Sequence, residues 1–149
     1  CSSTQLRTYQ NRLSGPLLDR VDLRARLEQV SRAVLTNGAA GEPTAAVRER
    51  VLEARARAAR RLAGTPWSTN SDVPGPDLRR LWPIPSDALT SLSAGYDRGS
   101  LSTRGLDRVM KVAWTLADDA GRDLPSRDDV DRAFGFRVRS ERLELVRTA

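Results

Sequence analysis

The sequence predicts a mainly α-helical protein. Two long stretches, from Pro43 to Leu62 and from Ser102 to Ala120, carry apolar residues at the three- and four-residue spacing of a helix face. Only one short stretch, from Leu23 to Glu28, alternates apolar and charged residues as a strand does. With 149 residues, 39% of them hydrophobic, the chain can bury a core. We therefore expect a helical bundle preceded by a short helix and one strand.

The first 36 residues contain the short helix and the strand. A helix is predicted from Thr4 to Leu13 and is expected to end at Gly15-Pro16. The alternating strand that follows cannot pair the backbone N–H and C=O groups along its own edges. It therefore needs partner strands that this chain does not contain, or it stays poorly ordered. After a helical turn at Ser31 to Thr36, the small residues from Asn37 to Gly41 are typical of a linker. We place a domain boundary there.

The longest predicted helix begins at Pro43, which suits the first helical position, and stops near Gly64. Its apolar stripe consists of Val47, Val51, Ala54, Ala58 and Leu62, bordered by Arg48 and Arg55 on one edge and by Arg50, Arg57 and Arg61 on the other. Arginine stems beside an apolar stripe are typical of a solvated helix that packs on a core. The alternative is a face for nucleic acid or a partner, with Arg48, Arg55 and Arg57 as the contacts.

The remainder of the chain is predicted to be helical. Residues 65 to 76 contain three prolines and indicate a loop that Trp67 holds against the core. Helices are expected at Asp77–Trp82, Ser86–Tyr96, Ser102–Ala120 and Ser126–Phe134. Ser126 and Asp129 have the spacing of a capping box, and Gly121 suits the residue after a helix end. Residues 138–149 are polar, and we expect them to be weakly helical or disordered.

Several classes of site are excluded by residues that the sequence lacks. It has no histidine, which excludes imidazole catalysis, and its single cysteine, Cys1, cannot supply the roughly four ligands of a structural zinc. It has no G-x-x-x-x-G-K-[ST] loop, and its only lysine, Lys111, lies within a predicted helix. These residues alone are therefore not expected to hold ATP or a metal ion.

The net charge of +6 favours polyanionic partners such as DNA or RNA. No apolar run approaches the roughly 18 residues of a membrane span, and no signal peptide is evident, so we expect a cytoplasmic location without membrane contact. Because the chain begins with Cys1, we expect it to be a piece of a longer protein. The alternative is a mature bacterial lipoprotein, which Cys1-Ser2-Ser3 resembles.

Two motifs resemble one known family. Residues 12–23 include Leu17-Leu18-Asp19-Arg20, and residues 101–121 read LSTRGLDRVMKVAWTLADDAG. They resemble, in order, the end of the ATPase core and the sensor 2 helix of magnesium-chelatase-like AAA+ proteins, closest to the YifB/ComM group. The resemblance implies that residues 1–36 are the end of an AAA+ core, 37–42 a linker, 43–137 a helical lid and 138–149 a polar tail.

The resemblance also implies roles for three arginines. Arg20 would be an arginine finger that acts on the nucleotide of a neighbouring subunit, and Arg104 would be the sensor 2 residue, with Arg108 as support. From the residues alone, Arg20 could instead form a surface salt bridge with Asp19 or Asp22. Arg104 lies in the first turn of its helix, where free backbone N–H groups favour an anion.

The polar face of the 102–120 helix is expected to carry Arg104, Arg108, Lys111 and Thr115. We expect Asp118 and Asp119 to face mainly solvent. Trp114 occupies a place where the family is expected to have a basic residue, and we interpret it as a packing residue.

For the full-length protein, the resemblance implies ATP and Mg²⁺ as cofactors and a homo-oligomeric ring, expected to be a hexamer, that remodels DNA. Cys1 would be the last member of a cysteine cluster with zinc-ligand character. Val21-Asp22 after Arg20 favours the helicase-like group over the motor subunit of a true magnesium chelatase, which stays as an alternative. A second alternative is a basic helical nucleic-acid-binding module.

Overall fold

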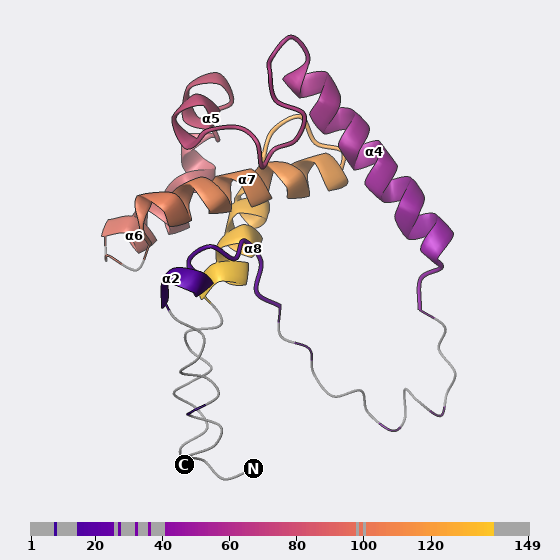
Figure 1. Cartoon of the computed structure of the whole chain (residues 1–149), viewed down its shortest axis with the longest axis horizontal. Coiled ribbons are helices and arrows are strands. Elements are labelled where there is room, and N and C mark those ends of the chain that lie inside the picture. Colours follow the sequence, from indigo (N-terminus) through magenta and orange to yellow (C-terminus); the bar gives the residue numbers. More distant parts are fainter. Residues whose placement is uncertain are drawn as a thin grey trace.

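The computed structural model describes residues 8, 15–25, 27, 32, 36, 41–97, 99 and 101–138. Its elements, in chain order, are α2 (Gly15–Leu18), α4 (Thr44–Leu62), α5 (Gly75–Leu81), the 3-10 helix η1 (Ser86–Leu89), α6 (Thr90–Asp97), α7 (Thr103–Asp119) and α8 (Arg127–Val138) (Figure 1). The described residues include no strand, which confirms the mainly α prediction. Most of the predicted 4–13 helix, most of the 37–42 linker and almost all of the 138–149 tail lie outside the described residues.

The bundle is built around α7. This helix crosses α8, meets α4 near its C-terminal end and contacts α5 and α6 (Figure 1). The core consists of Leu62, Val73, Leu78, Ile84, Ala88, Leu92, Leu101, Val109, Met110, Ala113, Trp114, Val130 and Ala133. Trp114 is 1% exposed, and its indole N–H donates to the carbonyl oxygen of Trp82 at 3.1 Å. The predicted packing role of Trp114 is confirmed.

The ends of α7 and the start of α8 follow their sequence signals. Ser102 caps α7 by accepting the Gly105 amide at 3.0 Å. After α7, Gly121 has a φ of 72°. The Gly121 amide donates to the carbonyl oxygen of Asp118 at 3.2 Å, and the Arg122 amide donates to that of Ala117 at 2.9 Å, which is a Schellman motif. At α8, the amide of Ser126 donates to the Asp129 carboxylate at 2.9 Å, and the Asp129 amide donates to the Ser126 hydroxyl at 3.3 Å. The predicted capping box is confirmed.

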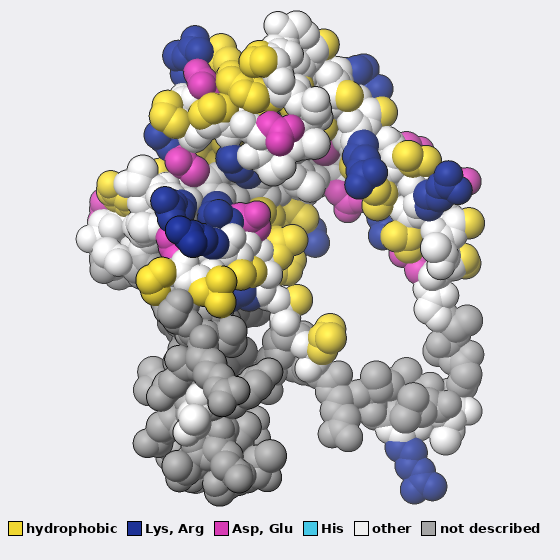
Figure 2. All heavy atoms as spheres, in the orientation of Figure 1, with side chains coloured by type: hydrophobic (Ala, Val, Ile, Leu, Met, Phe, Trp, Pro, Cys, Tyr) yellow, Lys and Arg dark blue, Asp and Glu magenta, His cyan; other side chains and the backbone are white. Residues whose placement is uncertain are grey.

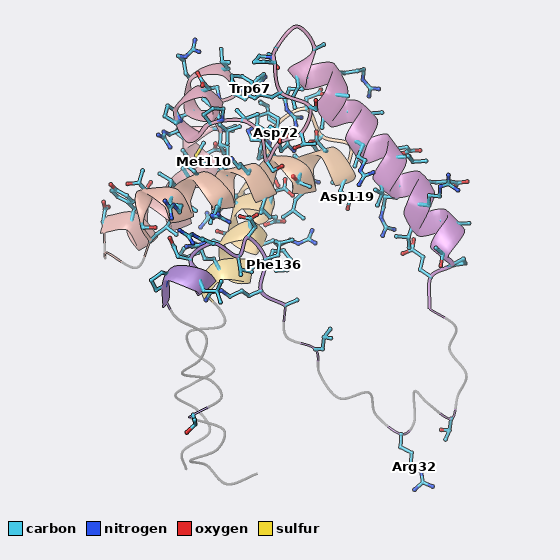
Figure 3. All side chains as sticks on the ribbon, in the orientation of Figure 1. Arg32, Trp67, Asp72, Met110, Asp119 and Phe136 are labelled. Carbon is cyan, nitrogen blue, oxygen red and sulfur yellow. The ribbon has the colours of Figure 1, made fainter. Side chains whose placement is uncertain are left out.

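Residues 15–25 differ from the sequence prediction. Gly15-Pro16 begins the helical turn α2, where a helix end was predicted, and proline is well suited to the first turn of a helix. Residues 21–25 and 27 form no strand, because the described residues offer no strand for them to pair with. Residues 21–25 run instead beside α8, where the Arg24 amide donates to the carbonyl oxygen of Phe136 at 3.1 Å (Figure 3).

Helix α4 contacts the bundle mainly through its C-terminal half, and its N-terminal half projects away from the other helices (Figure 1). Leu62 is its only fully buried residue, and Val51 in the predicted apolar stripe is 39% exposed. The side that meets α7 carries Arg57 and Arg61, which the sequence had placed at one edge of that stripe.

Asp118 is buried, which contradicts the expected solvent-facing position, whereas Asp119 is exposed. The Arg61 guanidinium donates to the Asp118 carboxylate at 2.6 Å, and the Asn70 amide donates to it at 3.1 Å. The same guanidinium stacks 4.2 Å from the ring centroid of Trp114. A partner on α4, 57 residues away in the chain, is what allows this carboxylate to be buried.

Candidate functional site

The best candidate for a functional site is a set of charged residues where three segments meet. Asp19, Arg20 and Asp22 lie in the turn that follows α2. Arg104 and Arg108 come from the first two turns of α7, and Arg137 comes from the end of α8. We call this set the Arg20–Arg104 face. In Figure 2, basic side chains gather where α2 lies beside α7.

Asp19 forms an ion pair with Arg137. The Arg137 side chain is only 10% exposed and lies against Gly105 of α7. A Cβ atom at position 105 would lie 2.8 Å from Arg137 Nε, closer than such atoms normally approach. Gly105 therefore leaves the space that Arg137 needs to reach Asp19.

Asp22 forms an ion pair with Arg108. Arg108 also donates a 2.6 Å hydrogen bond to the backbone carbonyl oxygen of Arg20. The chain on both sides of the Arg20 side chain is thus attached to the bundle, through Asp19 to α8 and through Asp22 to α7.

Arg20 itself is exposed, and its guanidinium has no hydrogen-bond or ion-pair partner among the residues that the structure describes. Both acids that the salt-bridge hypothesis assigned to it, Asp19 and Asp22, bind other arginines. That alternative is therefore wrong for the described residues. As far as the described residues go, this cation is available to bind an anion from outside the bundle.

Arg104 is also exposed and also has no such partner within the described part of the chain. It lies one turn before Arg108, so the two share a side of α7. Further along, the Lys111 ammonium donates to the carbonyl oxygen of Ser71 at 2.7 Å, and the Thr115 hydroxyl donates to the Lys111 carbonyl at 3.0 Å. Of the predicted polar face, Arg104 is the cation left available.

The three arginines predicted as nucleic-acid contacts lie on α4 and are not brought to the Arg20–Arg104 face. Arg48 and Arg55 are exposed and have no carboxylate partner among the described residues. Arg57 donates to the carbonyl oxygen of Asp118 at 2.8 Å and pairs with Glu53 at 3.2 Å. Arg57 therefore serves the C-terminal end of α7, where a cation is favourable.

The residues of the Arg20–Arg104 face fit a phosphate group better than a metal ion. Two exposed cations without carboxylate partners suit phosphate oxygens. Within the described residues, no three Asp, Glu, His or Cys side chains lie close enough to share a metal ion. Both acids at this face are neutralised by arginines. None of the described helices is both long enough and apolar enough to cross a membrane.

Sequence reasoning did not predict the ion pair between Asp19 and Arg137. They lie 118 residues apart, and no local pattern links them. One signal was present, because a glycine within a helix, here Gly105, commonly marks a close approach by another group.

The comparisons with known proteins agree with the two motifs. A family model described as magnesium chelatase, subunit ChlI C-terminal, matches residues 41–137, and a model for magnesium chelatase, subunit ChlI, matches residues 1–35. An uncharacterized protein of Mycobacterium tuberculosis (strain H37Rv) is 47% identical over 137 residues, which cover 92% of this chain and 27% of the relative.

Two further relatives carry the names that the resemblance predicted. The protein YifB of Escherichia coli (strain K12), itself described as uncharacterized, is 32% identical over 93% of the chain and 27% of its own length. The competence protein ComM of Haemophilus influenzae is 32% identical over 92% of the chain and 26% of its own length. The chain thus spans about a quarter of the length of these relatives. Because the C-terminal model alone matches well over half of its residues, the chain belongs to the family of the magnesium chelatase subunit ChlI, with YifB and ComM among its relatives.

Proposed function

We propose that this chain is the C-terminal part of a cytoplasmic, ring-forming AAA+ ATPase, in which residues 43–137 act as the lid over the nucleotide. Arg20 serves as the arginine finger toward the nucleotide of a neighbouring subunit, and Arg104 contacts phosphate oxygens as the sensor 2 residue. The observation that carries the proposal is that these two arginines are exposed and unpaired among the described residues, while the acids beside Arg20 bind Arg108 and Arg137.

The physical basis is the charge that builds up on phosphate oxygens during phosphoryl transfer. ATP with Mg²⁺ supplies the transferable phosphoryl group, and residues upstream of this chain would hold most of both. A guanidinium already engaged by a carboxylate would have to break that pair before binding phosphate. Arg20 and Arg104 need no such exchange with the residues described around them. Their electrostatic stabilisation is therefore available without reorganisation.

The ring is proposed to work on DNA. The net charge of +6 and the exposed Arg48 and Arg55 support a nucleic-acid partner. Stimulation of ATP turnover by DNA, but not by a porphyrin with Mg²⁺, would separate this function from that of a chelatase motor subunit.

The test is steady-state ATP hydrolysis by the full-length protein and its Arg20→Ala variant, with DNA present. Loss of an arginine finger lowers turnover by about 10³-fold or more. The matched control is Arg132→Ala, which removes an exposed arginine of α8 that has no carboxylate partner in the described part of the chain. Equal turnover of Arg20→Ala and wild type, with equal ring assembly, would disprove the finger role.

A second candidate function is direct DNA binding by α4 without any role in ATP hydrolysis. It is favoured by the projection of the N-terminal half of α4 away from the bundle (Figure 1) and by the exposure of Arg48 and Arg55 on this helix. This candidate predicts that Arg48 and Arg55 matter more for DNA affinity than Arg20. If Arg104→Ala alone abolished DNA binding, the candidate would fail.

A further inference from the structure

We propose that the ion pairs Asp19–Arg137 and Asp22–Arg108 form a latch that positions Arg20 relative to Arg104. The inference rests on the proposed function and deepens it. It makes Arg108 and Arg137 positioning residues, which touch no nucleotide themselves but hold the finger of a subunit to the lid of the same subunit.

Two hydrogen bonds that involve the backbone reinforce the two ion pairs of the latch over the same short stretch of chain. Asp19 binds Arg137, Asp22 binds Arg108, the Arg20 carbonyl accepts from Arg108 at 2.6 Å, and the Arg24 amide donates to Phe136 at 3.1 Å. The outer two attachments, at Asp19 and Arg24, are to α8, and the inner two, at Arg20 and Asp22, are both to Arg108 of α7. A turn held in this way can change its position only together with those two helices, so its orientation follows theirs.

Burial shows which attachment matters most. The Arg137 side chain is 10% exposed, and a buried guanidinium without a counter-charge is strongly unfavourable. The Arg137 side chain packs directly on Gly105, since a Cβ atom added at position 105 would lie 2.8 Å from Arg137 Nε. Arg137 is thus confined between Gly105, next to the sensor residue, and Asp19, next to the finger residue.

The latch also sets the charge around Arg20. If Asp19 and Asp22 were not engaged by Arg137 and Arg108, both would be close enough in the chain to pair with Arg20 and neutralise it. The two helices therefore leave Arg20 without an acidic partner among the described residues and at the same time fix its place. Arg104 lies one turn before Arg108 on the same helix, so a displacement of α7 by phosphate at Arg104 would reach Arg20 through Arg108.

The experiment uses the full-length protein and combines ATP turnover with hydrogen exchange of peptides that contain Arg24. We expect Arg137→Met to speed exchange at this segment and to lower kcat by about a hundredfold, the cost of misplacing a catalytic group by about 1 Å. The KM for ATP should stay unchanged, because the finger stabilises charge that develops in the transition state and not the bound ground state. In an Arg20→Ala background, Arg137→Met should lower kcat no further. Arg132→Met on the same helix should change neither readout.

The outcomes separate the latch from the proposed function. Unchanged exchange in Arg137→Met would show that the ion pair does not hold the segment. Faster exchange with unchanged kcat, in a protein whose Arg20→Ala variant is inactive, would overturn the latch and leave the finger intact. If Arg20→Ala is itself fully active, the proposed function fails, and the positioning role fails with it. Should Arg137→Met not fold, Asp19→Asn tests the same pair from its more exposed side, and the charge-reversed pair Asp19→Arg with Arg137→Asp should recover kcat.

Discussion

Arg61 and Asp118 form a largely buried ion pair between α4 and α7, with side chains 14% and 2% exposed. In Arg61→Met, the methionine keeps much of the packing on Trp114 but leaves the Asp118 carboxylate buried with Asn70 as its remaining side-chain partner among those described. Breaking one half of a buried pair in this way costs about 3–5 kcal/mol. We therefore expect the free energy of unfolding, measured by urea denaturation, to fall by about 3 kcal/mol.

The matched control for this prediction is Arg55→Met, an equal change on an exposed side of the same helix, which should shift the free energy of unfolding by no more than about 0.5 kcal/mol. Similar effects of the two substitutions would mean that Asp118 does not depend on Arg61. Asp118→Asn in the Arg61→Met background should recover part of the loss, since it removes the unpaired charge.

The start of helix α8 depends on one buried carboxylate, that of Asp129. Burial favours its neutral form, but the amide and hydroxyl of Ser126 and the guanidinium of Arg122 outweigh burial and lower its pKa. Its contribution to stability is therefore complete above the unfolded pKa of about 3.9 and is lost as the pH falls through the lower folded value. We expect Asp129→Asn to lose about 2 kcal/mol of unfolding free energy at pH 7 and to lose less stability on acidification than wild type.

Asp128→Asn provides the control, because Asp128 is the exposed acid next to Asp129 in the same first turn. Thermal unfolding from pH 7 to pH 2.5 would compare the three proteins. Equal acid sensitivity of the Asp129→Asn variant and wild type would contradict a stabilising role for this carboxylate in the helix cap.

On the scale of the whole molecule, charge and shape together predict how DNA would be bound. Each arginine that contacts a phosphate adds about one to the slope of log affinity against log salt concentration. We expect the Arg48→Ala/Arg55→Ala double variant to bind duplex DNA more weakly and with a slope smaller by about two. Arg57→Ala should mainly reduce folding stability, because Arg57 donates to the end of α7.

Fluorescence anisotropy over a series of salt concentrations would measure the slopes, with Arg132→Ala as a control for a basic residue on another helix. An unchanged slope in the double variant would show that Arg48 and Arg55 of α4 do not contact DNA phosphates. A reduced slope in Arg20→Ala or Arg104→Ala would place the phosphate contacts on the Arg20–Arg104 face instead.

Local signals in the sequence were enough to predict the helices from α4 onwards and several of their ends. The Ser126–Asp129 capping box and the stop at Gly121 depend on residues within a turn of one another, and both were confirmed. The predicted strand depended on partners outside the chain, and residues 21–25 lie beside α8 instead. The expected exposure of Asp118 was wrong because its partner, Arg61, lies 57 residues away.

By itself, the sequence determined the helical class, the helix caps, the family and the identity of Arg20 and Arg104 as candidates, because each depends on neighbouring residues or on a contiguous motif. Only the tertiary structure decided which charges are paired. Asp19 and Asp22 could equally have bound Arg20, and the packing of α7 and α8 assigns them to Arg108 and Arg137. Ion pairing depends on distance in space, which a linear sequence does not fix, and for this reason the latch could be recognised only in the folded chain.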